Sequence, residues 1–288
     1  MHLLIYLLTY PLIKFISILP FKLVYKLSDF LSYLLHKVFK YRLKTVQKNI
    51  KLVFPDKDKN ELKNIEKSFY KHFADISIES INAFGMSKKE MKARYTYENI
   101  DELERIQKKN KNIILICGHY SNFEWLLSIG YNVKGNGYGI YTPMTNKYFD
   151  RLFKKIRKKH NAFLVSRYHI NDFMNNLDIN KYHLFGFASD QSPRKIGKSY
   201  ISEFLGHKVP IFTGAERFSN DYGLSVVFAD ITRTKRGHYK TKFIEIIDKK
   251  DTTYSITDQF LRLLENQIYR DPSQYFWTHN RFKHLRTN

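Results

Sequence analysis

The first 54 residues carry an apolar stretch followed by an amphipathic one. Residues 3–21 are mostly apolar apart from Lys14, and no basic segment precedes them. A simple membrane span needs about 20 uninterrupted apolar residues, so the lysine and two prolines argue against one. The absence of a basic start also argues against a secretory signal peptide.

From Lys22 onward the pattern becomes that of a basic amphipathic helix. Apolar residues recur at helical spacing among lysines, at Leu23, Leu27, Phe30, Leu31, Leu34, Leu35 and Val38. Such a helix suits the surface of an anionic membrane, and the same pattern also describes a helix packed on the rest of the protein. We expect residues 1–54 to form membrane-associated helices.

Beyond Pro55 the pattern alternates between helical and strand-like segments. Helical spacing predicts helices at 61–84, 99–108, 146–159, 170–176, 213–221 and 256–270. Short apolar runs predict strands at 95–97, 113–117, 137–141, 162–165, 183–188, 224–230 and 239–247. This alternation is typical of an α/β fold with a mostly parallel or mixed central sheet flanked by helices. Without a repeat period or a long polar linker, residues 55–288 are expected to form one domain.

Charge and cysteine content narrow the choice of partners. The 288 residues hold 49 Lys and Arg against 27 Asp and Glu, a net charge of +22, and residues 1–54 contribute nine basic residues and one acid. This excess favours an anionic partner: nucleic acid, anionic lipid or an acidic carrier protein. The single cysteine, Cys117, excludes an intramolecular disulfide and a multi-cysteine metal site, and the histidines lack metal-binding spacing, so we expect no metal.

The candidate chemistry lies where the most apolar strand ends. Residues 113–117 are followed by a segment that contains His119 and Glu124, and in α/β sheets the ligand crevice lies outside the carboxyl ends of the strands. We expect Ser121 or Asn122 to cap a helix whose first turn carries Glu124 back toward the imidazole. A carboxylate on one ring nitrogen leaves the other free to act as a general base. A structural histidine beside a helix-capping glutamate would have the same spacing.

Asp190 and Gln191 follow the strand expected at 183–188, so they should lie near the same crevice as His119. Turn chemistry alone would also explain the Asp190–Pro193 segment. Thr213 and Gly214 mark a helix start, whose free amides suit a phosphate, a reaction oxyanion or only the helix itself.

The segment IILICGHYSNFEW (113–125) resembles the first motif of the lipid A biosynthesis acyltransferases, within the wider H-x4-D/E glycerolipid acyltransferase group. Further blocks resemble that family in the same order: RLKTVQKNIKLVFP (42–55), YTPMTN with FDRL (141–152), FASDQSP (187–193), FLG with FTGA (204–215) and YFWTHNRFK (275–283). Six ordered blocks along nearly the whole chain are far more specific than one short motif.

The resemblance implies that His119 is a general base and Glu124 its charge partner. A hydroxyl of a lipid A precursor would attack the thioester of an acyl carrier protein or coenzyme A directly, without an acyl-enzyme or a cofactor. It also implies a place on the cytoplasmic face of the inner membrane. Residues with an implied substrate-binding role are Asn122, Tyr141, Asn146, Asp190, Gln191, Thr213 and Gly214.

One departure from the family pattern leaves the acceptor open. Thr142 stands where the family usually has arginine, and Arg151, Arg194 or Arg217 could supply that charge instead, although each also has the pattern of a solvated surface residue. A lysophospholipid or an aminolipid is therefore an alternative acceptor. A non-catalytic protein that binds membranes or nucleic acid is a second alternative, although no helix-turn-helix, RNP-like or zinc-finger motif favours nucleic acid.

Overall fold

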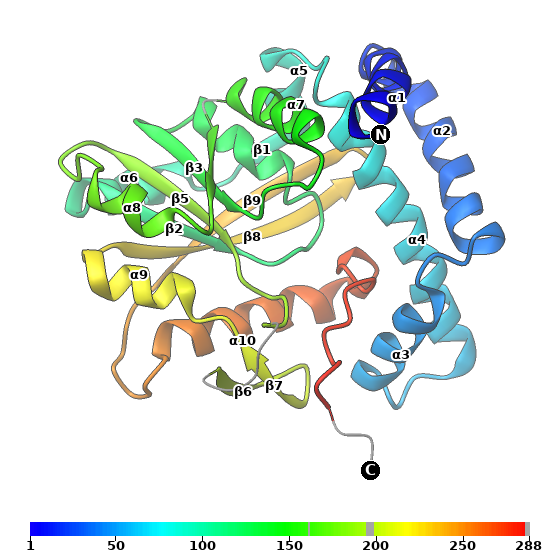
Figure 1. The fold of residues 1–288 in the computed structure, drawn as a ribbon. Helices are drawn as coiled ribbons and strands as arrows, with labels where there is room; N and C mark the ends of the chain where they lie inside the picture. The colour runs from blue at the N-terminus through cyan, green and yellow to red at the C-terminus, as the bar shows by residue number, and fades with distance from the viewer. Residues whose placement is uncertain (161, 194–198, 286–288) are drawn as a thin grey trace.

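A seven-stranded sheet forms the centre of the computed structural model, which describes residues 1–160, 162–193 and 199–285 (Figure 1). The strand order is β1-β9-β8-β2-β5-β3-β4, and every neighbouring pair is parallel except β8 with β9. The strands are β1 (Tyr95–Tyr97), β2 (Asn112–Cys117), β3 (Asn136–Tyr141), β4 (Ala162–Ser166), β5 (His183–Ala188), β8 (Ser225–Lys235) and β9 (His238–Ile246). The predicted α/β fold with a mostly parallel sheet is confirmed.

Alternate residues of β2 enter two separate cores, because side chains along a strand point to opposite faces. Ile114 and Ile116 pack in the larger core, and Ile113 and Leu115 pack in the smaller one. The helices that cover the sheet and its flanks are α4 (Lys59–Asn82), α5 (Lys88–Arg94), α6 (Ile100–Lys109), α7 (Lys147–Lys158), α8 (Ile170–Asn175), α9 (Gly214–Tyr222) and α10 (Ser255–Arg270). Helices on both faces explain why all six residues of β2 are buried.

Three elements depart from the sequence prediction. The antiparallel hairpin of β6 (Tyr200–Phe204) and β7 (His207–Ile211) was not predicted, nor was the short helix α5. The hairpin turns at Leu205 and Gly206, both with positive φ, and its inward side chains are buried in the larger core beside α10. The helix expected after Asn122 is a short 3-10 helix, η2 (Trp125–Tyr131).

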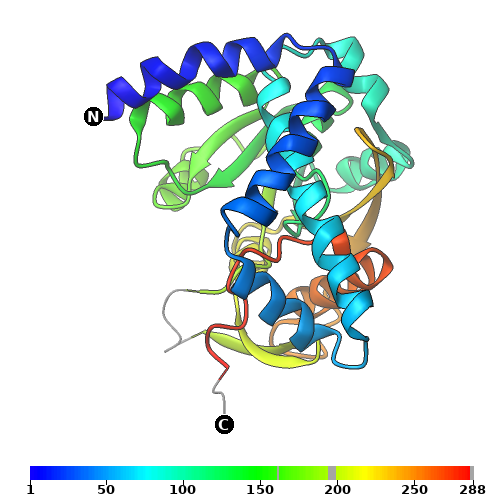
Figure 2. The same cartoon turned by 90° about the vertical axis from the view of Figure 1, so that its right-hand side faces the viewer.

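The N-terminal region forms α1 (His2–Ser17), α2 (Phe21–Tyr33), a π-helical turn at Leu34–Val38 and α3 (Leu43–Val53). Lys40 and Arg42 adopt left-handed backbone angles, which end the amphipathic helix before α3 begins. Helix α2 lies along α4, and α1 lies beside α7 (Figure 2). None of the helices in the described ranges is both long and apolar enough to cross a bilayer.

Candidate active site

His119 and Asp190 form a hydrogen-bonded pair at the carboxyl edge of the sheet. Strands β2 and β5 are parallel with Cys117 opposite Ala188, so the two side chains, each two residues further on, arrive side by side. Nδ1 of His119 lies 2.6 Å from Oδ1 of Asp190, and the same oxygen accepts the backbone N–H of His119 at 3.0 Å. A neutral His119 that donates its Nδ1 proton to Asp190 presents Nε2 as a base.

Gln191 completes the surroundings of the imidazole. Its side-chain nitrogen lies 3.3 Å from Nε2 of His119, where the amide donates to the unprotonated ring nitrogen. Rings of Phe123 and Phe276 flank the imidazole, with centroids 4.9 and 6.1 Å away. The predicted meeting of His119, Asp190 and Gln191 in one crevice is confirmed.

The loop after β2 is held tightly from both sides. A Cβ on Gly118 would lie 2.5 Å from a methyl group of Leu264 on α10, so any larger residue there would require the Leu264 side chain to move. Ser121 has a left-handed φ of 52°, and Oδ1 of Asn122 accepts the N–H of Trp125 at 2.9 Å. These contacts delay the start of the helix until Trp125.

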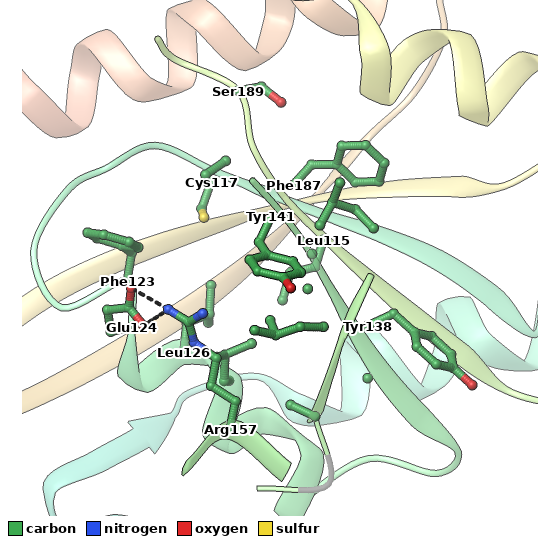
Figure 3. A pocket seen from close by; sticks show the side chains of 18 of the residues that line it. Leu115, Cys117, Phe123, Glu124, Leu126, Tyr138, Tyr141, Arg157, Phe187 and Ser189 are labelled. Atoms are coloured by element: carbon green, nitrogen blue, oxygen red, sulfur yellow. Dashed lines mark hydrogen bonds and ion pairs between the residues drawn. The ribbon is translucent and has the colours of Figure 1, made fainter. Parts of the chain in front are cut away.

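Glu124 does not contact the imidazole, contrary to the sequence prediction. Because η2 begins one residue after it, Glu124 lies outside the helix, and its two carboxylate oxygens accept hydrogen bonds from Nη2 of Arg157 on α7 at 2.8 and 2.6 Å (Figure 3). Asp190 holds the ring position expected for Glu124. Glu124 still acts on His119 through its charge.

Opposing effects set the pKa of His119. Burial lowers it most as a single effect, but the charge of Asp190, the Asp190 hydrogen bond and the charge of Glu124 together raise the pKa of His119 above its usual value. Burial also raises the pKa of Asp190, yet the imidazolium charge and hydrogen bonds from His119 outweigh it and lower the Asp190 pKa to about 2. Asp190 is therefore ionised at neutral pH.

His279, a second histidine near this crevice, has a lowered pKa, whereas that of His119 is raised. Burial lowers the pKa of His279 to about 4, and its Nε2 accepts the backbone N–H of Ser192 at 3.1 Å. A neutral imidazole fixed in this way supports the segment that follows Asp190. It leaves His119 as the histidine whose base nitrogen faces the crevice.

His119 lines a cavity of about 490 Å³ that lies over one face of the sheet. Figure 3 shows this cavity from close by, with Leu115, Tyr141 and Arg157 among its lining residues. Strands β2, β5, β3 and β4 form its floor, and Leu126, Leu127 and Ile129 of η2 line another wall. Most of the lining is apolar, and the polar groups Glu124, Arg157, Arg167 and Gln191 belong to residues that follow the strands or lie on α7. An apolar cavity beside a small convergent set of polar groups is typical of a site for a long apolar substrate.

Comparison with known proteins agrees with this site. A family model described as bacterial lipid A biosynthesis acyltransferase matches residues 2–284. The chain belongs to this family. It is an acyltransferase of lipid A biosynthesis, as its relatives are by name.

The curated relatives cover most of the chain at low identity. A lipid A biosynthesis palmitoleoyltransferase of Escherichia coli is 21% identical over 272 residues, which are 92% of this chain and 86% of the relative. A lipid A biosynthesis lauroyltransferase of the same organism is 23% identical over 276 residues, 92% and 87% of the two chains. A lipid A biosynthesis acyltransferase of Haemophilus influenzae is 23% identical over 255 residues, 86% and 79% of the two chains.

The remaining residues expected to bind substrate in this acyltransferase divide into two groups. Tyr141, Gln191 and Gly214 line the cavity. Thr213 precedes α9 outside the lining, and Asn146 caps α7 by accepting the N–H of Tyr148 while its amide donates to the backbone oxygen of His2. Their substrate roles stay predictions.

The structure contradicts a substrate contact for Asn122. Its side chain is fully buried behind the loop, where the amide nitrogen donates to Oε2 of Glu79 at 2.7 Å and the oxygen caps Trp125. Both polar atoms are therefore used in holding the loop. The contact with Glu79 could not be predicted from the motif, because Glu79 lies 43 residues earlier in the chain.

Two arginines of the site were missed from the sequence. Arg157 is one of six basic residues of α7, so the sequence did not single it out. Arg167 follows β4 one residue after Ser166, whose register partner Tyr141 directly precedes Thr142. Both arginines line the cavity, and among the described residues no carboxylate pairs with Arg167. Of the cations named from the sequence, Arg151 and Arg217 lie on the surface outside the lining, and Arg194 falls outside the described residues.

Proposed function

We propose that this acyltransferase transfers a fatty acyl chain from a thioester of acyl carrier protein or coenzyme A to a hydroxyl of a lipid A precursor, with His119 as the general base. The observation that carries the proposal is the placing of Nε2 of His119 beside an apolar cavity, while Asp190 holds Nδ1. The names of the relatives, lipid A biosynthesis lauroyltransferase and palmitoleoyltransferase, support a fatty acyl donor and a lipid A acceptor.

The proposed reaction is a direct displacement. Nε2 of His119 takes the proton of the acceptor hydroxyl as its oxygen attacks the thioester carbon, which gives a tetrahedral intermediate. The C–S bond then breaks, and the leaving thiolate takes the proton from the imidazolium. Asp190 stabilises the imidazolium during this sequence, as the carboxylate of a catalytic triad does.

An acyl-enzyme on cysteine is disfavoured. Cys117 is buried within β2, and burial, with smaller effects from the charges of Asp190 and Glu124, raises the pKa of its thiol to about 12. A thiol of such high pKa supplies almost no thiolate at neutral pH. No step of the proposed reaction needs a cofactor.

Two further groups are proposed to serve the reaction. The negative charge of Glu124 supports the imidazolium, while its ion pair fixes Arg157 in the cavity wall. Gly214 lines the cavity at the first turn of α9, where backbone amides have no acceptor within the helix. We assign its amide to the oxyanion of the tetrahedral intermediate.

The acceptor is proposed to place an anionic group near Arg167. Arg167 and Thr142 each follow one residue after the register pair Ser166–Tyr141, and both line the cavity, so this rim carries a positive charge although the usual arginine of the family is replaced. Lysophospholipids and aminolipids are the alternative acceptors. Mass spectrometry of the lipids that lose an acyl chain when the protein is deleted separates the three classes.

Residues 1–54 are proposed to hold the enzyme on the cytoplasmic face of the inner membrane, where thioester donors are available, with residues 55–288 as the acyltransferase domain. Leu4, Leu8, Leu12 and Phe15 of α1 are each more than half exposed. Helix α7 beside it carries six basic residues and one acid. An apolar helix next to a basic one suits an anionic lipid surface.

The test is acyl transfer from a thioester to lipid A precursor by purified His119→Ala. Loss of a general base should lower kcat by roughly a hundredfold to ten-thousandfold. The matched control is His169→Ala, because His169 is exposed and lies outside the cavity that His119 borders. Turnover by a folded His119→Ala protein at the rate of the control would refute the mechanism.

A further inference from the structure

Two glycines face each other in the floor of the cavity. Gly139 of β3 is the register partner of Gly186 of β5, and both line the cavity. Leu115 continues this row on one side and Leu164 on the other. The centre of the row therefore carries no side chain, while its two ends carry leucines.

The backbone conformation of these strands does not call for glycine. Neither Gly139 nor Gly186 is among the described residues with positive φ, so alanine could adopt the same angles. Glycine inside a strand weakens it, and it often marks a place where a ligand or another backbone approaches closely. Here the cavity lies directly above both residues, which points to a ligand.

The cavity continues beyond the glycine row. The row lies two residues before Cys117 and Ala188, the last residues of β2 and β5. At the usual rise per residue of a strand, it is about 7 Å further from the carboxyl edge of the sheet. One further row down, Leu184, Gly137 and Ala162 also line the cavity. A chain that starts at His119 must pass over Gly139 and Gly186 to reach this inner part.

A side chain on either glycine would enter that passage. A Cβ on Gly186 would lie 3.8 Å from the backbone oxygen of Tyr138 and 3.9 Å from Cα of Gly139, which are ordinary contacts. A Cβ on Gly139 would lie 3.2 Å from the tip of the Leu164 side chain, which must yield slightly. Alanine thus fits the protein at Gly186, and it fits at Gly139 once the tip of Leu164 moves by a few tenths of an ångström. At either position its methyl group takes space from the cavity.

We propose that the Gly139–Gly186 pair determines the length of the acyl chain that the enzyme accepts, by keeping the passage to the inner cavity open. The inference rests on the proposed function, since it takes the occupant of the cavity to be the acyl chain of the thioester. Short chains end before the glycine row. Longer chains need the space above it.

The experiment compares Gly186→Ala with the wild-type enzyme on a homologous series of saturated acyl carrier protein thioesters. For the longest chains that the wild type uses, kcat/KM should fall by roughly tenfold to a hundredfold, since a hydrophobic pocket discriminates a methylene to about that extent. For the shortest chains it should stay unchanged. Gly139→Ala should shift the preference in the same direction and serves as the second variant.

The control is Phe185→Leu, a change in the same strand on the opposite face of the sheet. It should leave the chain-length preference unchanged while altering stability. A folded Gly186→Ala enzyme with the wild-type preference would overturn the inference, even with full acyltransferase activity. Absence of transfer from every thioester by the wild type would instead refute the proposed function.

Discussion

At the scale of single residues, the H-x4-E motif indicates His119 but not the carboxylate that contacts its ring. His119 as the proposed base is predictable, because its position after an apolar strand and the resemblance both indicate it. The hydrogen-bond partner is not, since Asp190 lies 71 residues away and meets the ring only through the pairing of β2 with β5. The local spacing to Glu124 indicated the nearer carboxylate, which instead pairs with Arg157.

Asp190→Asn should change both the rate and its pH dependence. The general base must be neutral, so kcat/KM of the wild type should rise with pH through the raised pKa of His119. Without the charge of Asp190, burial dominates and lowers that pKa, so the rising limb moves to lower pH. The maximum rate should fall about a hundredfold or more, because the tautomer and the imidazolium lose their support.

Glu124→Gln is the matched comparison for the pH profile. Its charge contributes less to the pKa of His119 than that of Asp190, so the rising limb should move the same way by a smaller amount. A pH profile of Asp190→Asn that coincides with the wild-type profile would contradict the assignment. Initial rates at limiting acceptor and saturating thioester, which give kcat/KM for the acceptor, supply the measurement across the neutral and acidic range.

At the scale of elements, most boundaries follow from periodicity. The strand at 183–188 and the short strand at 95–97 match their predicted ends, and α7 and α10 agree within a residue. Helix α5 was missed because it has only seven residues, too few for a periodic pattern. The 3-10 form of η2 was beyond prediction, since it depends on Leu264 and Glu79 holding the preceding loop.

Helix α4 brings an unpredicted buried carboxylate behind that loop. Glu79 accepts hydrogen bonds from Tyr25 of α2, Tyr239 of β9 and Asn122 of the loop, at 2.8, 2.8 and 2.7 Å. Burial is the largest cause that raises its pKa to about 7, and these donors only partly oppose it. One side chain thus joins an N-terminal helix, the sheet and the loop that carries His119.

Glu79→Gln should make the stability of the protein less dependent on pH. The folded state holds the Glu79 proton up to about pH 7 and the unfolded state releases it near 4.5, so the wild type loses stability as pH rises between these values. Glutamine should abolish this loss, which is about 3 kcal/mol for a shift of this size. Urea unfolding at both ends of that range measures it.

The control for Glu79→Gln is Glu104→Gln on the exposed face of α6. This change should leave the pH dependence of unfolding as in the wild type. Equal pH dependence in the Glu79→Gln variant and the wild type would show that Glu79 is not the group that titrates.

At the scale of the whole molecule, basic charge and exposed apolar side chains occur together where α1 lies beside α7. The sequence predicted membrane-associated helices from an apolar stretch, a basic stretch and the net charge of +22. The structure adds what no pattern showed, that α1 lies against the basic helix α7 (Figure 2). It also joins α3 to the catalytic part, since Asn49 donates to the backbone oxygens of Trp277 and His279 at 2.8 Å.

Replacing Leu4, Leu8 and Leu12 together with glutamine should weaken binding to anionic vesicles. These side chains are exposed, so the change removes apolar contact with lipid without opening a cavity in the protein. Burial of one leucine contributes about 1.5–3 kcal/mol, so even partial insertion of three predicts a loss of at least tenfold in vesicle affinity. Binding of the wild type should also weaken at high salt, because screening reduces the attraction of the basic residues.

The matched control replaces exposed apolar residues elsewhere, Ile201, Ile247 and Tyr269, with glutamine. Sedimentation with vesicles should show the control variant binding as the wild type does. Equal sedimentation of the α1 variant and the control would contradict the docking of α1 on the membrane.

The position of β5 has a consequence for the newly made chain. Strand β5 is synthesised after β3 and β4 but inserts between β2 and β3 in the finished sheet. A nascent chain that has emerged only as far as β4 therefore carries the complete H-x4-E motif without the His119–Asp190 pair, because Asp190 is still to come. In the finished fold the His119–Asp190 pair therefore depends on the pairing of β5 with β2, and the H-x4-E segment alone does not supply it.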